Sequence, residues 1–133
     1  MKKELQDKLF KEYPKIFAQR KLPMTESCMC WGIETSDGWY WLIDKLCSHL
    51  QWDTDHNKYP QIEAVQVKEK YGTLRFYTNG SNDAQEGMIS FAEFISGFIC
   101  EKCGSTEDVS QTKGWIVTLC KKCMENKNDS QTI

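Results

Sequence analysis

Apolar residues recur every three or four positions in three stretches of the chain, which is the spacing that an amphipathic helix produces. The first stretch predicts a helix over about residues 3–13, because Pro14 cannot continue the helical hydrogen bonds. The other two predict helices over about residues 37–50 and 83–99, the last starting with Asp83 and Glu86 as a capping box. The residues expected to face the core are Leu5, Leu9, Tyr13, Ile16, Phe17, Trp39, Leu42, Ile43, Leu46, Leu50, Met88, Phe91, Ala92, Ile95 and Ile99.

The period of the pattern changes to two between the second and third helices, after a polar loop expected over residues 53–60. Apolar residues alternate with polar ones on both sides of a Tyr-Gly dipeptide, and they are Val65, Val67, Leu74 and Phe76. This pattern predicts a β-hairpin over about residues 62–78 whose apolar face packs on the helices. The fold class is therefore expected to be α+β, with three helices packed on one β-hairpin.

The other face of the predicted hairpin collects basic and aromatic residues, which are Lys68, Lys70, Arg75 and Tyr77, with Tyr71 in the turn beside them. Basic side chains interleaved with aromatic rings suit single-stranded nucleic acid or a nucleotide ligand. The alternative is a solvated sheet face on which lysines protect an edge from pairing. Both interpretations stay open, because Glu63 and Glu69 keep the positive patch small.

Two Cys-x-x-Cys pairs stand near the end of the chain and carry its strongest chemical signal. Cys100 and Cys103 form the first pair, and Cys120 and Cys123 follow after sixteen intervening residues. This spacing is typical of a zinc site with four thiolate ligands. In a reducing cytosol such pairs are metal ligands more often than disulfides.

Four thiolates fill the tetrahedral coordination of zinc and leave no position for water, so the predicted zinc ion, one per chain, is structural. The first pair precedes a predicted hairpin, and the second pair precedes a polar segment that can begin a helix. This order predicts a zinc unit of the treble-clef or zinc-ribbon type. The third helix runs into Cys100 without a linker, so we expect the zinc unit to be docked on the rest of the chain.

The remaining cysteines raise the question of a second metal site made of Cys28, Cys30, Cys47 and His49. The geometry disfavours it, because residues two apart on a helix point about 200° away from each other. Cys47 and His49 both fall within the second predicted helix. A buried Cys47 and unpaired loop cysteines are the simpler interpretation.

Length, charge and composition limit the classes of function. The chain has 133 residues and a formal net charge of −2, which argues against a protein held on nucleic acid by bulk charge alone. No apolar run reaches the length of about 18 residues that a membrane-spanning helix needs, and the charged N-terminus lacks the apolar core of a signal peptide. We therefore expect a cytosolic protein that does not contact membranes.

No motif for catalysis stands out in the chain. The sequence has two histidines, His49 and His56, and neither lies in a recognisable catalytic motif. A Gly-rich phosphate loop and a nucleophile elbow are also missing from the sequence. We therefore expect no enzymatic activity, with a dispersed site, for example Cys28 with His49, as the alternative.

Three longer motifs follow one another along the chain. They are GWYxLIDxLC from Gly38, VKEKYGTLRFY from Val67, and the two cysteine segments CEKCG and GWIxTLCxxC from Cys100 and Gly114. Over roughly residues 37–123 the chain resembles a widespread family of small proteins encoded by bacteriophages and prophages, whose members generally have no assigned function. The resemblance supports the four zinc cysteines and marks as part of the family signature Lys68, Lys70, Tyr71, Gly72 and Arg75.

The resemblance implies an intracellular phage accessory protein. Small proteins of this kind often bind a host macromolecule, including components of host defence, or a signalling nucleotide. We therefore expect a host protein as the partner, with nucleic acid or a nucleotide as the alternative. The expected organisation is an α+β body over residues 1–99, a docked zinc unit over 100–125 and a flexible tail over 126–133.

Overall fold

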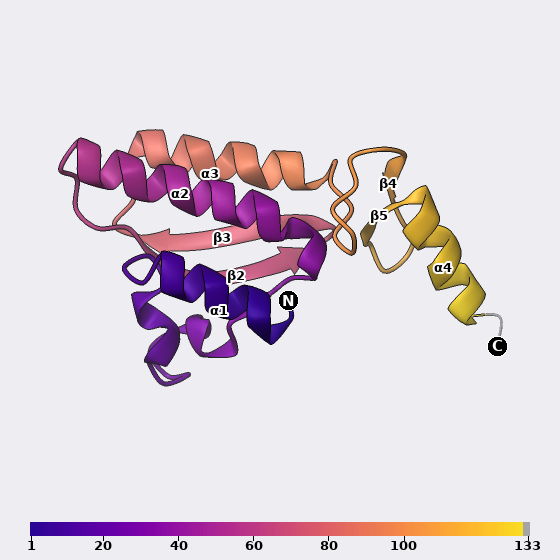
Figure 1. Ribbon diagram of the computed structural model, residues 1–133, viewed down its shortest axis with the longest axis horizontal. Helices are drawn as coiled ribbons and strands as arrows, with labels where there is room; N and C mark the ends of the chain where they lie inside the picture. The colour runs from indigo at the N-terminus through magenta and orange to yellow at the C-terminus, as the bar shows by residue number, and fades with distance from the viewer. Residues whose placement is uncertain (132–133) are drawn as a thin grey trace.

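The structure is a computed structural model that describes the backbone of residues 1–131 and the side chains of residues 1–127. Its helices are α1 (Lys3–Glu12), α2 (Tyr40–His56), α3 (Asp83–Ser96) and α4 (Lys121–Gln131) (Figure 1). Its strands are β1 (Ile33–Glu34), β2 (Glu63–Lys70), β3 (Thr73–Asn79), β4 (Val109–Gln111) and β5 (Thr118–Cys120). Three 3₁₀ turns are η1 (Ala18–Lys21), η2 (Cys28–Trp31) and η3 (Asp37–Trp39). The fold class is α+β as predicted, but four helices and two small sheets replace the expected three helices on one hairpin.

The larger sheet has the strand order β1-β2-β3. Strands β2 and β3 are antiparallel and are joined by the Tyr71–Gly72 turn, whereas β1 pairs in parallel with β2 and places Ile33 opposite Val67. The hairpin was predicted from its alternation. The third strand was not, because its two residues are too few to show a period.

The register of β2 shifts between Ala64 and Gln66, which makes Val65 a bulge residue. As a result Ala64 and Val67 are fully buried, while Val65 is half-buried. The prediction that Val65 faces the core is therefore wrong. A bulge reverses the facing of every residue before it, and the apolar pattern alone does not reveal it.

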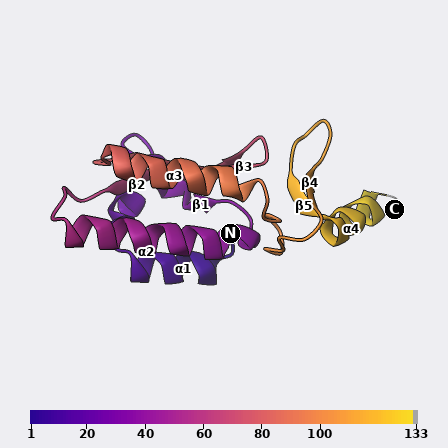
Figure 2. The ribbon, with the colours of Figure 1, turned by 90° about the horizontal axis from the view of Figure 1, so that it is seen from above.

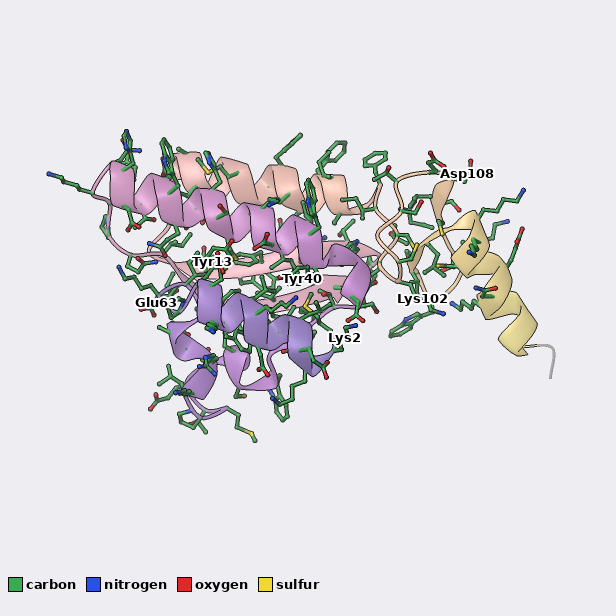
Figure 3. All side chains as sticks on the ribbon, in the orientation of Figure 1. Lys2, Tyr13, Tyr40, Glu63, Lys102 and Asp108 are labelled. Atoms are coloured by element: carbon green, nitrogen blue, oxygen red, sulfur yellow. The ribbon has the colours of Figure 1, made fainter. Side chains whose placement is uncertain are left out.

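The core lies between the sheet and the two helices α1 and α2, which are on the same side of it (Figures 1 and 2). The predicted core residues of the first two helical segments are buried, apart from the half-buried Leu5. Tyr13, directly after α1, links α1 to α2, because its hydroxyl donates a hydrogen bond to the Asp44 carboxylate at 2.7 Å (Figure 3). Burial and this carboxylate raise the pKa of Tyr13, so its hydroxyl keeps its proton and remains a donor.

Helix α2 continues to His56, beyond the predicted end at residue 50. Part of the expected polar loop is therefore helical. Its polar residues Asp53 and Thr54 are buried and have side-chain partners. Gln85 of α3 donates to the Thr54 hydroxyl at 2.9 Å, and Asn57 donates to one carboxylate oxygen of Asp53 at 2.9 Å, while the other oxygen is buried without a partner. The last turns of this helix were not predicted, because their residues are mostly polar and resemble a loop in the sequence.

Helix α3 starts at Asp83 as predicted, but it ends at Ser96 instead of residue 99, and its cap and one predicted core residue differ from the prediction. Its capping box uses Asn82 and Gln85, one residue earlier than Asp83 and Glu86. The buried residues of α3 are Gln85, Ile89, Ala92 and Ser96, whereas the predicted core residue Phe91 is exposed. The other predicted core residues of this segment are buried or packed against the core, namely Met88, Ala92, Ile95 and Ile99.

The second role of α3 is to cover the free edge of β3. Ser96 accepts a hydrogen bond from the Leu74 N–H at 2.8 Å, and Glu93 accepts one from the Phe76 N–H at 2.9 Å. Two backbone donors that would otherwise face solvent are therefore satisfied by side chains.

The C-terminal unit consists of the β4–β5 hairpin and α4, and it lies at one end of the body (Figure 1). Helix α4 continues through residues 126–131. The flexible tail predicted from Asn126 thus falls on helical residues as far as Gln131, and its last two residues lie outside the described part of the chain. None of the helices in residues 1–131 has both the length and the apolar character needed to cross a membrane.

Hydrogen bonds of backbone and side-chain groups connect the segment just before α2 to residues 99–101, at the start of this unit. The Gly38 N–H donates to the Glu101 carbonyl at 2.7 Å, and the Ser36 N–H donates to the Glu101 carboxylate at 2.9 Å. Trp39 donates its indole N–H to the Ile99 carbonyl at 2.9 Å. Gly38 fits because it has no side chain, since a Cβ there would lie 2.1 Å from the Cys100 carbonyl oxygen.

We expect Gly38→Ala to lower the free energy of unfolding by about 1–3 kcal/mol or more, because the added methyl group forces the two segments apart. The matched control is Gly87→Ala in α3, where a Cβ meets no atom within 4 Å. That substitution should raise stability by about 0.5–1 kcal/mol, because alanine favours the helix. Urea unfolding followed by circular dichroism measures both, and equal values for the two variants would contradict the close approach.

Candidate functional site

The four paired cysteines converge in the C-terminal unit. The sulfur atoms of Cys100, Cys103, Cys120 and Cys123 all lie within 4.8 Å of one another, and those of Cys103 and Cys120 are 3.7 Å apart. Cys120 ends β5 and Cys123 lies in the first turn of α4, while Cys100 and Cys103 lie in the segment between α3 and β4. Such a cluster can hold a metal ion, as the spacing of the cysteines predicted.

Two backbone turns bring the sulfurs together. In the first pair, the Gly104 N–H donates to the Cys100 carbonyl at 2.8 Å, and Gly104 has a φ of +83°, which glycine adopts without strain. In the second pair, the Cys123 N–H points at the Cys120 sulfur at 3.4 Å. A hydrogen bond of 3.0 Å from the Glu101 N–H to the Thr118 carbonyl ties the two turns to each other.

The electrostatics of the cluster favour a bound cation. Burial raises the pKa of Cys100, but backbone hydrogen bonds from Cys120, Cys103 and Lys102 outweigh it and lower the pKa to about 7. Burial and hydrogen bonds with the other sulfurs raise the pKa of Cys123 to about 12. The raised pKa means that the Cys123 thiol favours its protonated form, whereas a divalent cation at the centre of the cluster would stabilise the thiolates.

The other candidate ligands do not come together. Cys47 is fully buried in the core, and burial raises the pKa of its thiol well above the usual value, which makes it inert. Cys28 and Cys30 are exposed in η2, and His49 is exposed on α2 with its ring stacked on Trp52. Within residues 1–127 the four paired cysteines are the one group of three or more such side chains close enough to share an ion.

The structure divides the predicted hairpin face between two grooves. Lys68 and Arg75 lie opposite each other in the sheet. Arg75 and Tyr77 line a groove of about 430 Å³ against α3, together with the acidic Glu86 and Glu93. The acidic residues make this groove less suited to an anion than the sequence suggested.

The second groove, which we call the hairpin–loop groove, lies between the end of the β2–β3 hairpin and the β4–β5 loop. It is lined by residues 68–71 and 114–116 and has a volume of about 330 Å³. Lys68, Lys70 and Tyr71 line it as predicted members of the partner face, and Trp115 joins them from the C-terminal unit. The sequence did not suggest Trp115, because the residue lies 44 positions after Tyr71 in the chain.

Tyr71 occupies an unfavourable backbone conformation at this groove. Tyr71 and Gly72 both have positive φ, at 53° and 83°, as a two-residue type I′ turn requires. Asn, Asp and Gly are preferred at the first position, and another residue in the left-handed region costs about 1–2 kcal/mol. The Tyr71 side chain is nevertheless 71% exposed, so burial in this chain does not offset the cost. Strain of this kind tends to occur at functional sites.

A third feature is an exposed aromatic surface on α2 and α3. Side chains project outward from both helices along the upper side of the molecule (Figure 3). Five large aromatic residues of α2, of α3 and of the turn directly after α3 are between 54% and 64% exposed, and we call them the α2–α3 aromatic face: Trp41, Trp52, Phe91, Phe94 and Phe98. The i, i+3, i+7 spacing of the three phenylalanines was the sequence signal for this surface.

Comparison of the chain with protein-family models, with curated proteins and with solved structures gives no match.

We expect Cys120→Ser to abolish the binding of a divalent metal ion, because it removes one of four converging sulfurs. Cys47→Ala and Cys28→Ser should leave the metal content unchanged, since these residues lie outside the cluster. Elemental analysis of the purified variants measures this. Loss of metal in Cys28→Ser would show that the second group of cysteines also contributes.

Proposed function

We propose that this chain is a phage accessory protein that binds a host protein through the α2–α3 aromatic face, with a structural zinc ion in its C-terminal unit. The exposed aromatic face is the observation that carries the proposal. Aromatic residues are enriched in the cores of protein interfaces, and large exposed apolar patches on soluble proteins mark binding sites.

The size of the aromatic face fits a protein partner. The exposed fractions of its five residues add up to about three whole aromatic side chains. At about 200 Å² for each side chain, the exposed aromatic surface is roughly 600 Å². A standard interface buries about 800 Å² on each partner, so the aromatic residues would supply most of its apolar centre. The stacked rings of His49, Trp52 and His56, with centroids 5.6 and 4.6 Å apart, hold part of this surface rigid before binding.

The phage origin and the host partner rest on the resemblance of the three sequence motifs. A component of host defence is one class of host protein that such an accessory protein would bind. We place its action in the host cytosol, where reducing conditions keep the cysteines available for metal.

The choice of zinc rests on the chemistry of the donors. A tetrahedral zinc ion with Zn–S bonds of about 2.3 Å separates its sulfurs by about 3.8 Å, and the Cys103 and Cys120 sulfurs are 3.7 Å apart. The order of a first cysteine turn, a hairpin and a second turn at the start of α4 favours the treble-clef type. With its four positions filled, the ion would hold the unit together and take no part in a reaction, which favours a binding role over an enzymatic one.

We expect purified protein to contain about one zinc ion per chain. Removing the ion with a chelator should increase amide hydrogen exchange in residues 100–123, because the metal supplies much of the folding free energy of a small zinc unit. The exchange of α1 should change far less. Two zinc ions per chain, or no change in residues 100–123, would contradict the proposed site.

The partner is tested by affinity capture from host lysate with the metal retained, comparing the native chain with Phe91→Ser/Phe94→Ser. We expect one stoichiometric host protein that the double variant fails to capture, because it loses the centre of the aromatic face. Trp31→Ser is the matched control, since Trp31 is an exposed aromatic residue on η2. Equal capture by all three proteins would reject this face, and a dimer of the chain that the double variant abolishes would replace the host partner with a second copy.

A further inference from the structure

The hairpin–loop groove brings together exposed aromatic rings and lysines from two units of the fold. Two of the most exposed aromatic side chains in the described part of the protein line it, Tyr71 at 71% and Trp115 at 80% exposure. They come from different units of the fold, the β2–β3 hairpin and the β4–β5 loop. Neither ring belongs to the core, so both rings are free to stack on a ligand.

Hydrogen bonds hold the backbone beneath both rings in place. The Thr112 hydroxyl donates to the Trp115 carbonyl at 2.6 Å and accepts from the Val117 N–H at 2.8 Å, so one side chain fixes the loop on both sides of Trp115. On the opposite side, the Gly72 N–H donates to the Glu69 carboxylate at 3.2 Å. The two aromatic residues are therefore presented on fixed backbone, which reduces the entropy lost when a ligand binds.

The charge around the groove favours an anionic group. Lys68 and Lys70 line it, and the Lys70 amino group lies 5.8 Å from the centre of the Tyr71 ring. Two carboxylates oppose them, Glu69, which is engaged with the turn, and Glu34, which neighbours Lys68 in β1. The lining of the groove itself therefore holds two lysines and one carboxylate, Glu69, although the whole chain has a net charge of −2.

We propose that the hairpin–loop groove binds a nucleobase together with its phosphate, as a free nucleotide or as part of a single strand. Tyr71 and Trp115 supply stacking surfaces for the base, and Lys68 and Lys70 contact the phosphate. The volume of about 330 Å³ suits a small ligand, since pockets for small molecules begin at about 300 Å³. The site shares no residue with the α2–α3 aromatic face and does not depend on a protein partner.

Strand β5, which ends at Cys120 of the cysteine cluster, packs against the hairpin turn. The Thr118 hydroxyl donates to the Gly72 carbonyl, and a Cβ on Gly72 would lie 2.9 Å from that same hydroxyl oxygen and 3.0 Å from Ile116. Thr118 is in β5, two residues before Cys120, so the metal unit packs directly on the hairpin turn. Loss of the metal should therefore separate Trp115 from Tyr71 and weaken ligand binding.

The test uses fluorescence anisotropy with the metal-loaded protein and a fluorescein-labelled thymidine oligonucleotide of about 12 residues, a length within the usual site sizes. Unlabelled oligonucleotide and each of the four common mononucleotides then compete for the site. Competition by a mononucleotide identifies a nucleotide site, and competition by the oligonucleotide alone identifies a single-strand site. Binding should weaken as salt is raised, because a phosphate contact releases counterions.

Two variants separate binding from folding. Tyr71→Asn places a preferred residue in the type I′ turn, so stability should hold or rise while affinity falls. Trp115→Ala removes an exposed ring and should leave stability unchanged. Each should weaken binding about 5- to 150-fold, the equivalent of about 1–3 kcal/mol for one stacked base.

Trp31→Ala, which removes an exposed indole far from the groove in sequence, should bind like the native chain. Phe94→Ser should also bind normally, so failure of this site and failure of the protein-binding face can be told apart. Absence of binding by both the oligonucleotide and the mononucleotides, or equal affinity of Tyr71→Asn, Trp115→Ala and the native chain, would overturn the proposal.

Discussion

The arrangement of the whole chain depends on the contact between Gly38 and the Cys100–Glu101 peptide. This is a contact between backbones, with a Gly38–Glu101 hydrogen bond of 2.7 Å and no room for a Cβ. It fixes the start of α2 and the first cysteine turn in one step. Because the cysteine turn also positions Thr118 against Gly72, the same contact determines where the C-terminal unit meets the hairpin. The cysteine cluster is therefore part of the architecture of the body as well as of its own unit.

Local patterns in the sequence were enough to locate the cysteine cluster, the hairpin and the first two helices. Each of these depends on residues close together in the chain, whose spacing carries the information. The docking at Gly38 depends on residues more than sixty positions away, and nothing near Gly38 in the sequence indicates why glycine is required there. Phe91 was wrongly assigned to the core because it also belongs to a second stripe with Phe94 and Phe98. Only the packing of Ile89 and Ala92 shows which stripe is buried.

The candidate binding surfaces also combine residues that the sequence pattern revealed with residues that only the fold revealed. Lys68, Lys70 and Tyr71 were identified from the hairpin pattern, whereas Trp115 became their neighbour only through the fold. The aromatic residues of α2 and α3 were expected to be core residues or were left unassigned, because a sequence does not say which apolar residues remain without a partner. For the hairpin–loop groove and for the α2–α3 aromatic face, the proposed binding role rests on the exposure of side chains, which is a property of the folded chain.

The hydrogen bonds from Leu74 and Phe76 to α3 limit how a partner can approach the sheet. An edge strand with free N–H groups can template another strand, so a peptide can bind by extending the sheet whatever its side chains are. Here Ser96 and Glu93 occupy those donors along β3. A partner at this edge has no backbone ladder to join, and it must instead be recognised by the shape and chemistry of its side chains. The covered edge therefore favours selective binding of a partner. It also prevents the unselective strand pairing and the aggregation to which an open edge strand is prone.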